Sequence, residues 1–199
     1  MANNARRPLA AGPTRVPRDR NRKAKIIASA RELFRERGYH AVGIDDIGEA
    51  AGITGPGVYR HFDGKQDLLV AALRGTVNEI WQDIEGHEDD PPDDVLRRYV
   101  MGHIDFAIRN ADMVVLWYQE SRNLPEDAWL EQRRLQRRYV EAWAGTLRAV
   151  RPELTAPQAR LMVHATIGLI HSIANYQSTL RREQIVEILA TMGLAALGS

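Results

Sequence analysis

Helical spacing of the apolar residues dominates this chain, and no stretch alternates apolar and polar residues as a half-buried strand would. In the first such stretch the apolar side chains recur every three or four positions, at Ile26, Ile27, Ala30, Leu33 and Phe34. Gly38 follows, and glycine is the residue that most readily ends a helix. With 44% hydrophobic residues the chain can bury a sizeable core, so the sequence predicts an all-α fold.

About nine helices are expected from this periodicity and from capping signals. After the first helix they are expected at about 44–51, from Thr54 onward, and at about 64–86, 93–110, 111–121, 125–150, 155–179 and 181–197. Asp63 with Gln66, and Thr155 with Gln158, match the capping box that opens a helix. The acidic, proline-containing run 87–94 is expected to be a loop. The predicted organisation is an arm at 1–17, a three-helix head at 18–63 and a helical body at 64–199.

The N-terminal segment is basic and the rest of the chain is acidic. Residues 1–25 carry a net charge of +7 in a chain whose total is +1, so the remainder carries −6. Several prolines and few apolar side chains predict disorder for residues 1–17. A basic arm on an acidic body indicates a polyanion bound at one end. From charge alone, a solubilising disordered tail is an equally good interpretation.

The segment 41–65, AVGIDDIGEAAGITGPGVYRHFDGK, predicts two short helices joined by a tight turn at Gly52. This is the helix-turn-helix arrangement, whose second helix enters the major groove of DNA. Small residues at 55–57 would let the start of that helix approach DNA closely, and donors and cations follow at Tyr59, Arg60, His61 and Lys65. Spacing alone favours DNA binding over the alternative, a helical hairpin whose glycines serve tight packing.

Signals of several other protein classes are missing from the sequence. The chain has no cysteine, which excludes disulfides, thiolate catalysis and cysteine-ligated zinc and fits a reducing cytoplasm. A phosphate-binding loop, an HExxH helix and a nucleophile elbow are also missing, so an all-α enzyme is the weaker alternative and no cofactor or metal is expected. The uncharged stretch 161–180 contains polar groups that are costly in lipid, so we expect a buried helix and no membrane partner.

The stretch from Ile26 to Leu69 closely resembles the tetracycline-repressor (TetR) family of transcriptional regulators. The pattern LF…RGY…DIGEAAGIT…VYRHF..K..LL carries the resemblance and covers about the first third of the chain. It implies a DNA-binding head, a ligand pocket within the middle helices of the body and a homodimer formed mainly by the last two helices.

The resemblance also assigns roles by position. Thr54 corresponds to the cap of the recognition helix, and Gly55, Pro56 and Gly57 to positions that face the major groove. The positions that correspond to phosphate or arm contacts are Arg20, Arg22, Tyr59, His61 and Lys65.

Two positions depart from the family pattern. Gly43 stands where a hydroxyl usually caps the first helix of the motif, and Asp45 stands where a basic residue is common. Specificity is then expected to rely on Thr54, Arg60, the arm and DNA shape.

Aromatic residues of the body are expected to line an apolar effector pocket. The residues that the resemblance favours are Trp81, Phe106, Trp117, Tyr118 and Trp143. His103, His164 and Asn175 are expected to orient a polar group of the ligand. Each of these residues taken singly is more often plain core.

Two further groups of polar residues in the body invite an interpretation. A metal site built on His103, His164 and His171 lacks a carboxylate to complete its ligands, so hydrogen-bonded core histidines are the better interpretation. Glu120 and Arg122 are interpreted as a structural ion pair.

The last two helices are expected to form the dimer interface. Residues 161–176 are apolar on nearly all sides, and the final helix carries an apolar stripe at Ile185, Ile188, Leu189, Met192 and Leu197. The alternative is that both are core helices of a monomer. Reading two half-sites on double-stranded DNA requires two-fold symmetry, which favours the dimer.

The expected function is a ligand-responsive repressor that binds an inverted-repeat operator and is released by a small hydrophobic effector. The alternatives are an activator, an architectural DNA-binding protein without a ligand, and an all-α enzyme.

Overall fold

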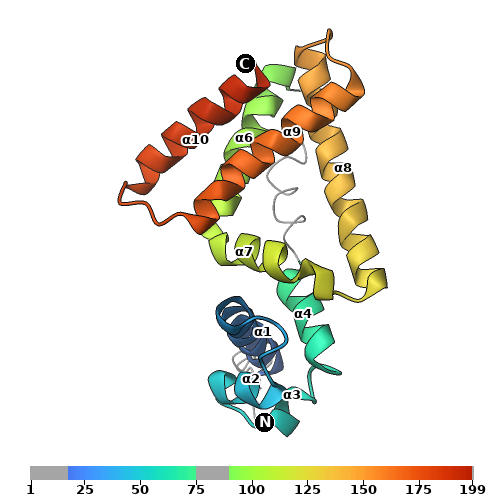
Figure 1. Cartoon of the computed structure of the whole chain (residues 1–199), viewed down its shortest axis with the longest axis vertical. Coiled ribbons are helices and arrows are strands. Elements are labelled where there is room, and N and C mark those ends of the chain that lie inside the picture. The colour runs from blue at the N-terminus through green and yellow to red at the C-terminus, as the bar shows by residue number, and fades with distance from the viewer. Residues whose placement is uncertain (1–17, 75–89, 199) are drawn as a thin grey trace, which may run out of the picture.

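The computed structural model of the chain describes residues 18–74 and 90–198, with residues 18–20 described in their backbone alone. Within these ranges the chain forms nine α-helices and no strand, which confirms the all-α prediction. The helices are α1 Arg18–Arg37, α2 Ile44–Ala51, α3 Gly55–Val58, α4 Lys65–Leu73, α6 Pro92–Arg109, α7 Ala111–Glu120, α8 Glu126–Val150, α9 Ala156–His171 and α10 Arg182–Leu197 (Figure 1). Trp81 and the start of the predicted loop at 87–94 lie outside the described residues.

Several helix ends follow the predicted signals. Gly38 and Gly52 have φ angles of 79° and 71°, the left-handed conformation that ends a helix cheaply with glycine. The Thr155 backbone N–H donates to Gln158 Oε1 at 2.9 Å, which confirms the second capping box.

Two predicted features of the helix ends are wrong. The Asp63 N–H donates to the Asp67 carboxylate at 3.3 Å instead of to Gln66, because Gly64 is the residue that caps α4. The helix predicted at 155–179 is shorter than expected. Helix α9 ends at His171 and is followed by a 3₁₀ turn, η2 Ser172–Asn175. There the Ser172 hydroxyl donates to the Leu169 carbonyl at 2.7 Å and competes with the helical ladder.

The head has its own hydrophobic core, made where α1 to α4 meet. Its fully buried members include Ile26, Phe34, Ile47, Val58 and Leu68. Apolar residues spaced three or four positions apart lie on one face of a helix, and each head helix turns that apolar face toward the core.

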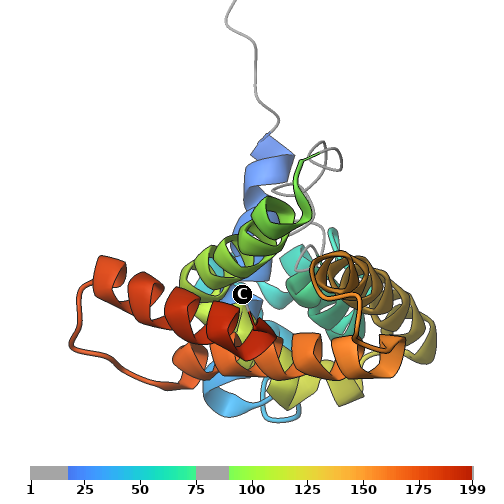
Figure 2. The same ribbon diagram turned by 90° about the horizontal axis from the view of Figure 1, so that it is seen from above.

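The body core lies between α6, α8, α9 and α10 and is centred on aromatic side chains that include Tyr99, Phe106, Tyr139 and Trp143. Seen from above, α9 and α10 lie next to each other along one side of the body (Figure 2). None of the described helices is long and apolar enough to cross a membrane.

Helix α7 belongs to both parts. It runs between the head and the rest of the body (Figure 1), with Val114 in the body core and Leu116 in the head core. Leu124, just after α7, also packs into the head core. The two parts therefore share a helix, since α7 contributes side chains to both cores.

Candidate nucleic-acid interface

Two glycines bring α2 and α3 into close contact. The backbone N–H groups of Gly52 and Ile53 donate to the carbonyls of Glu49 and Gly48, each at 2.9 Å, and so fold the chain back on α2. A side chain at Gly48 would lie 3.0 Å from the Gly55 nitrogen and the Thr54 carbonyl carbon. The α2–turn–α3 unit is thus a rigid helix-turn-helix whose geometry depends on glycine at position 48.

Gly55 does not face outward. It is buried, and a Cβ at this position would collide with the Asp45 carboxylate on α2. The prediction that Gly55 faces the major groove is therefore wrong, because its side is occupied by α2. Gly57 is half-buried against Ile53 and Thr54, and Pro56 is exposed.

The outer side of α3 carries exposed polar groups. Tyr59 is 58% exposed, Thr54 and Arg60 are also exposed, and Val58 points inward with no exposed surface. Thr54 is the N-cap residue as predicted, but its hydroxyl does not make the capping hydrogen bond and stays available to a ligand. An exposed phenol, hydroxyl and guanidinium at the two ends of this short helix can donate to phosphates and base edges. His61 is half-buried beside them.

Cations from the first helix flank this surface. Lys23 Nζ lies 4.9 Å from the centre of the Phe62 ring at the end of the motif, and Lys25 Nζ lies beside Gly52. Arg22 is exposed on the same helix, whereas the side chain of Arg20 lies outside the described residues. The sequence reasoning did not select Lys23 and Lys25, although they belong to the basic run that it counted.

Lys65 is turned toward the head. Its ammonium donates to the backbone carbonyls of Tyr39 and Val42, both at 2.9 Å, and lies 3.4 Å from that of His40. It also lies 4.6 Å from the centre of the Tyr39 ring. In this structure Lys65 holds the turn between α1 and α2 against α4, and its predicted contact with phosphate stays a prediction.

The departures from the family pattern at the start of α2 have a structural solution. Gly43 lacks a side chain to cap the helix, but its own N–H donates to Asp46 Oδ2 at 2.7 Å. Asp45 and Asp46 lie in the first turn, where carboxylates interact favourably with the helix dipole.

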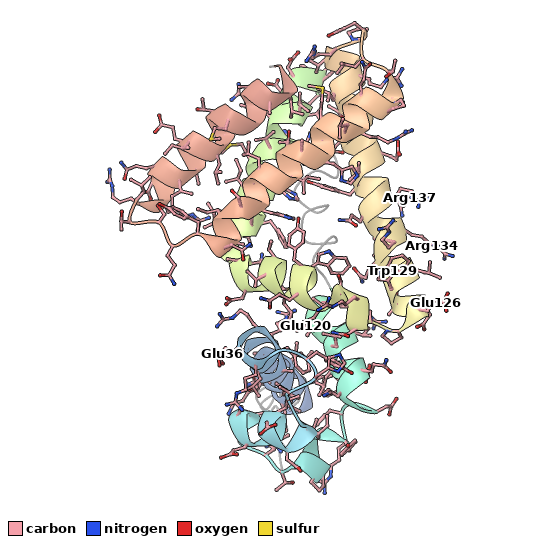
Figure 3. All side chains as sticks on the ribbon, viewed as in Figure 1. Glu36, Glu120, Glu126, Trp129, Arg134 and Arg137 are labelled. Carbon is pink, nitrogen blue, oxygen red and sulfur yellow. The ribbon has the colours of Figure 1, made fainter. Side chains whose placement is uncertain are left out.

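Glu120 at the end of α7 joins the body to the head (Figure 3). It is 7% exposed and accepts hydrogen bonds from the Tyr39 backbone N–H at 3.0 Å and from Asn123 Nδ2 at 2.6 Å. Burial and the Glu120 charge together raise the pKa of the Tyr39 phenol. The predicted ion pair between Glu120 and Arg122 is wrong, because these two donors hold the carboxylate.

Two histidines of the body bond to each other. His103 Nε2 lies 2.9 Å from His171 Nε2, and their outer nitrogens lie 3.1 Å from the hydroxyls of Tyr139 and Tyr118. Burial, and then the neighbouring His171, hold the pKa of His103 well below its ordinary value, and burial lowers the pKa of His171 to about 4. Both imidazoles are therefore neutral at pH 7, as expected for hydrogen-bonded core histidines.

The other predicted pocket residues separate into two groups. Phe106 and Trp143 are buried beside His103. Trp117 instead packs against the head core, because it lies on the side of α7 that faces α1. His164 and Asn175 are exposed, and their predicted role in orienting a ligand together with His103 stays a prediction. His164 points to the outer side of α9, beside Arg137 and Arg160.

Exposed apolar side chains gather on α9 and α10. Leu161 is 70%, Ile188 47% and Met192 49% exposed. Leu189 and Leu197, which the sequence placed on the same stripe, are buried in the body core. The predicted stripe is thus divided between two faces of α10.

Comparison with protein families agrees with this architecture. The model described as "Bacterial regulatory proteins, tetR family" matches residues 26–72, and that described as "Tetracyclin repressor-like, C-terminal domain" matches residues 89–197. The first match covers the helix-turn-helix and the second covers the body.

Known proteins match the chain in sequence over parts of its length. The transcriptional activator FasR of Mycolicibacterium smegmatis is 41% identical over 66 residues, which are 33% of this chain and 30% of FasR. The transcriptional repressor KstR2 of Mycobacterium tuberculosis is 26% identical over 133 residues, 64% of this chain and 65% of KstR2. The chain thus spans less than two thirds of the length of these relatives.

Solved structures match the fold over nearly the whole chain. A TetR-family regulator from Bordetella parapertussis has a TM-score of 0.78 at 20% identity, covering 87% of this chain and 94% of its own. The structure of AibR in complex with isovaleryl coenzyme A and operator DNA has a TM-score of 0.74 at 19% identity, covering 86% and 97%. With both halves of the chain matched by its family models, the protein belongs to the tetR family of bacterial regulatory proteins and is a transcriptional regulator.

Proposed function

We propose that this regulator is a ligand-responsive repressor that binds an inverted-repeat operator as a homodimer and is released by a small hydrophobic effector. The observation that carries the DNA-binding part is the outer surface of the helix-turn-helix. Thr54, Tyr59 and Arg60 are exposed there, and Lys23 and Lys25 of α1 flank them. Hydrogen-bond donors in the centre of this surface could contact base edges in a DNA groove, and the lysines at its edges could contact the phosphates that border the groove.

The proposed dimer uses the outer faces of α9 and α10. Their exposed apolar residues, Leu161, Ile188 and Met192, would be covered by the same face of a second copy. Two heads related by a two-fold axis then read two half-sites about one helical turn apart.

The proposed effector occupies the aromatic region of the body around His103, Phe106 and Trp143. Two relatives bear on the chemistry of the ligand: a ketosteroid is largely apolar, whereas isovaleryl coenzyme A carries only a small apolar acyl group. KstR2 is described as a ketosteroid transcriptional regulator, and AibR was solved with isovaleryl coenzyme A.

Helix α7 offers a route from the effector to DNA. Tyr118 bonds to His171 on the body side, and Glu120, two residues later, bonds to the Tyr39 backbone on the head side. An effector that favours one position of α7 would shift the heads between an operator-binding and a released arrangement.

Selection of bound sequences from a random duplex pool, at near-physiological salt, tests the proposal. An enriched palindrome with half-sites about one helical turn apart, bound by a dimer in sedimentation analysis, is the expected result. Salt-sensitive binding without enrichment would refute the operator-specific repressor and favour an architectural DNA-binding protein.

A further inference from the structure

Trp143 is a fully buried side chain with an unused hydrogen-bond donor. It lies on α8 with no exposed surface and stacks on Tyr99, with ring centres 5.3 Å apart and planes 10° from parallel. Its indole Nε1–H has no acceptor within the described part of the chain. A buried N–H without a partner is unfavourable, and such groups are rare in folded proteins.

The polar groups next to Trp143 are already engaged with one another. The His103 ring lies 5.8 Å from the indole, centre to centre, and so does the Tyr139 ring. A neutral imidazole has one N–H and one acceptor nitrogen, so the whole chain of contacts can be satisfied in either direction. Either Tyr139 donates to His103, His103 to His171 and His171 to the Tyr118 oxygen, or all three hydrogen bonds are reversed. Neither imidazole keeps a nitrogen for the indole.

We propose that the effector carries an uncharged carbonyl oxygen, as in a ketone, an ester or a thioester, which accepts the hydrogen bond of Trp143 Nε1–H. This inference rests on the proposed effector-binding role of the body. It adds the chemical class of the effector and the residue that recognises it.

The charges around Trp143 favour an uncharged ligand over a carboxylate. The aromatic side chains in contact with it bring no cation, and both nearby imidazoles are neutral because burial lowers their pKa. Arg134 and Arg137, on the same helix, point away from the body core (Figure 3). A buried carboxylate at the indole would keep its charge without a counter-ion, which is far more costly than burying a carbonyl.

Nuclear magnetic resonance of the intact protein with ¹⁵N-labelled tryptophan tests the contact directly. The chain has four tryptophans, so W81F, W117F and W129F assign the Trp143 indole signal by elimination even if W143F does not fold. Three probes share one seven-carbon tail: 2-nonanone, methyl octanoate and octanoate. Androst-4-ene-3,17-dione adds a bulkier diketone.

The expected result is a downfield shift of the Trp143 indole proton with a ketone or the ester, and none with octanoate at pH 7.5. Calorimetry should show W143F binding the same probe about two- to tenfold more weakly, the loss of one hydrogen bond. W129F, a half-exposed tryptophan on the same helix, is the matched control and should bind it like the wild type.

The inference is overturned if octanoate binds as tightly as 2-nonanone, if the Trp143 signal stays in place while a carbonyl probe binds, or if none of the carbonyl probes binds. It is also overturned if the ligand-free protein already shows the downfield position of a hydrogen-bonded indole. Operator selection is done without effector. A protein that selects a palindrome but fails these tests keeps the proposed repressor function and loses only the carbonyl class.

Discussion

The head and the body differ in where their polar side chains lie: outside the core in the head and inside the core in the body. In the head the core is wholly apolar, and the exposed Tyr59 and Arg60 lie on its outer surface. In the body His103, Tyr139 and the indole N–H of Trp143 lie inside the core itself. The head thus presents its polar side chains to the outside. The body encloses His103 and Tyr139 among aromatic side chains.

The largest expected effect comes from the contact between α2 and α3. Gly48→Val would push a branched side chain against the backbone of residues 53–55, so we expect a loss of about 3 kcal/mol in stability and loss of operator binding. Urea unfolding and a gel-shift titration measure the two. Gly145→Ala, at an exposed helix position with open space around it, is the matched control and should stabilise by about 0.5–1 kcal/mol. A stable, DNA-binding G48V would show that the two helices can separate freely.

Substitution of Lys65 separates structural support from DNA contact. K65M removes the donor that holds the carbonyls of Tyr39 and Val42, so we expect a stability loss of about 2 kcal/mol. If Lys65 also contacts a phosphate, as the sequence predicts, the slope of log affinity for the operator against log salt concentration should fall by about one in the folded fraction. An unaltered slope would make the role of Lys65 structural alone.

Glu120 tests how firmly the two regions are joined. E120A leaves the Tyr39 N–H and the Asn123 amide without their acceptor, and should lower the stability by about 1–2 kcal/mol. E120Q keeps an acceptor oxygen at similar size and should lie between E120A and the wild type. Effector-induced release from the operator should be weakened in E120A. Normal release in a folded E120A would place the coupling elsewhere.

The paired histidines give the body a dependence of stability on pH. The pKa of His171 is about 4 in the fold against 6.5 ordinarily, so between these values the unfolded chain binds more protons. The contribution of His171 to stability should therefore fall as the pH drops below 6.5, by up to about 1.4 kcal/mol per pH unit, and His103, whose pKa is also lowered, should add to this fall. H171Q should reduce the slope in thermal unfolding, with H164Q, at an exposed position, as the matched control.

The smallest effect on stability is expected at the outer surface of the head. R60A should change the free energy of unfolding by less than about 0.5 kcal/mol, because Arg60 is exposed. It should nevertheless weaken operator binding. If Arg60 contacts a phosphate, the slope of log affinity against log salt concentration should also fall by about one. R134A, on the outer side of α8 (Figure 3), is the control and should bind the operator normally.

The head was largely predictable from the sequence because its structure follows from short spacings. Gly38 and Gly52 end their helices as expected, and Thr54 begins α3. Contacts between distant segments were not predictable. Gly55 faces α2 instead of the groove, and Lys65 reaches back to carbonyls more than twenty residues earlier.

The interior of the body was less predictable than the head because its contacts join segments that are far apart in the sequence. His103 and His171 are 68 residues apart, and nothing in their local pattern indicates that they meet. His164 shares α9 with His171 but is exposed beside Arg137 and Arg160, whereas His171 bonds to His103. Trp143 could be predicted as a buried aromatic residue, whereas its unpaired N–H could be found only from three-dimensional neighbours.

The sharing of α7 has a consequence for engineering. Leu116 and Leu124 complete the head core although they follow the first body helices in the chain. A chimaera that grafts residues 18–74 onto another regulator's body would replace these two side chains with whatever the new body offers. Exchange of DNA specificity between relatives should therefore succeed only when the α7 surface is transplanted with the head.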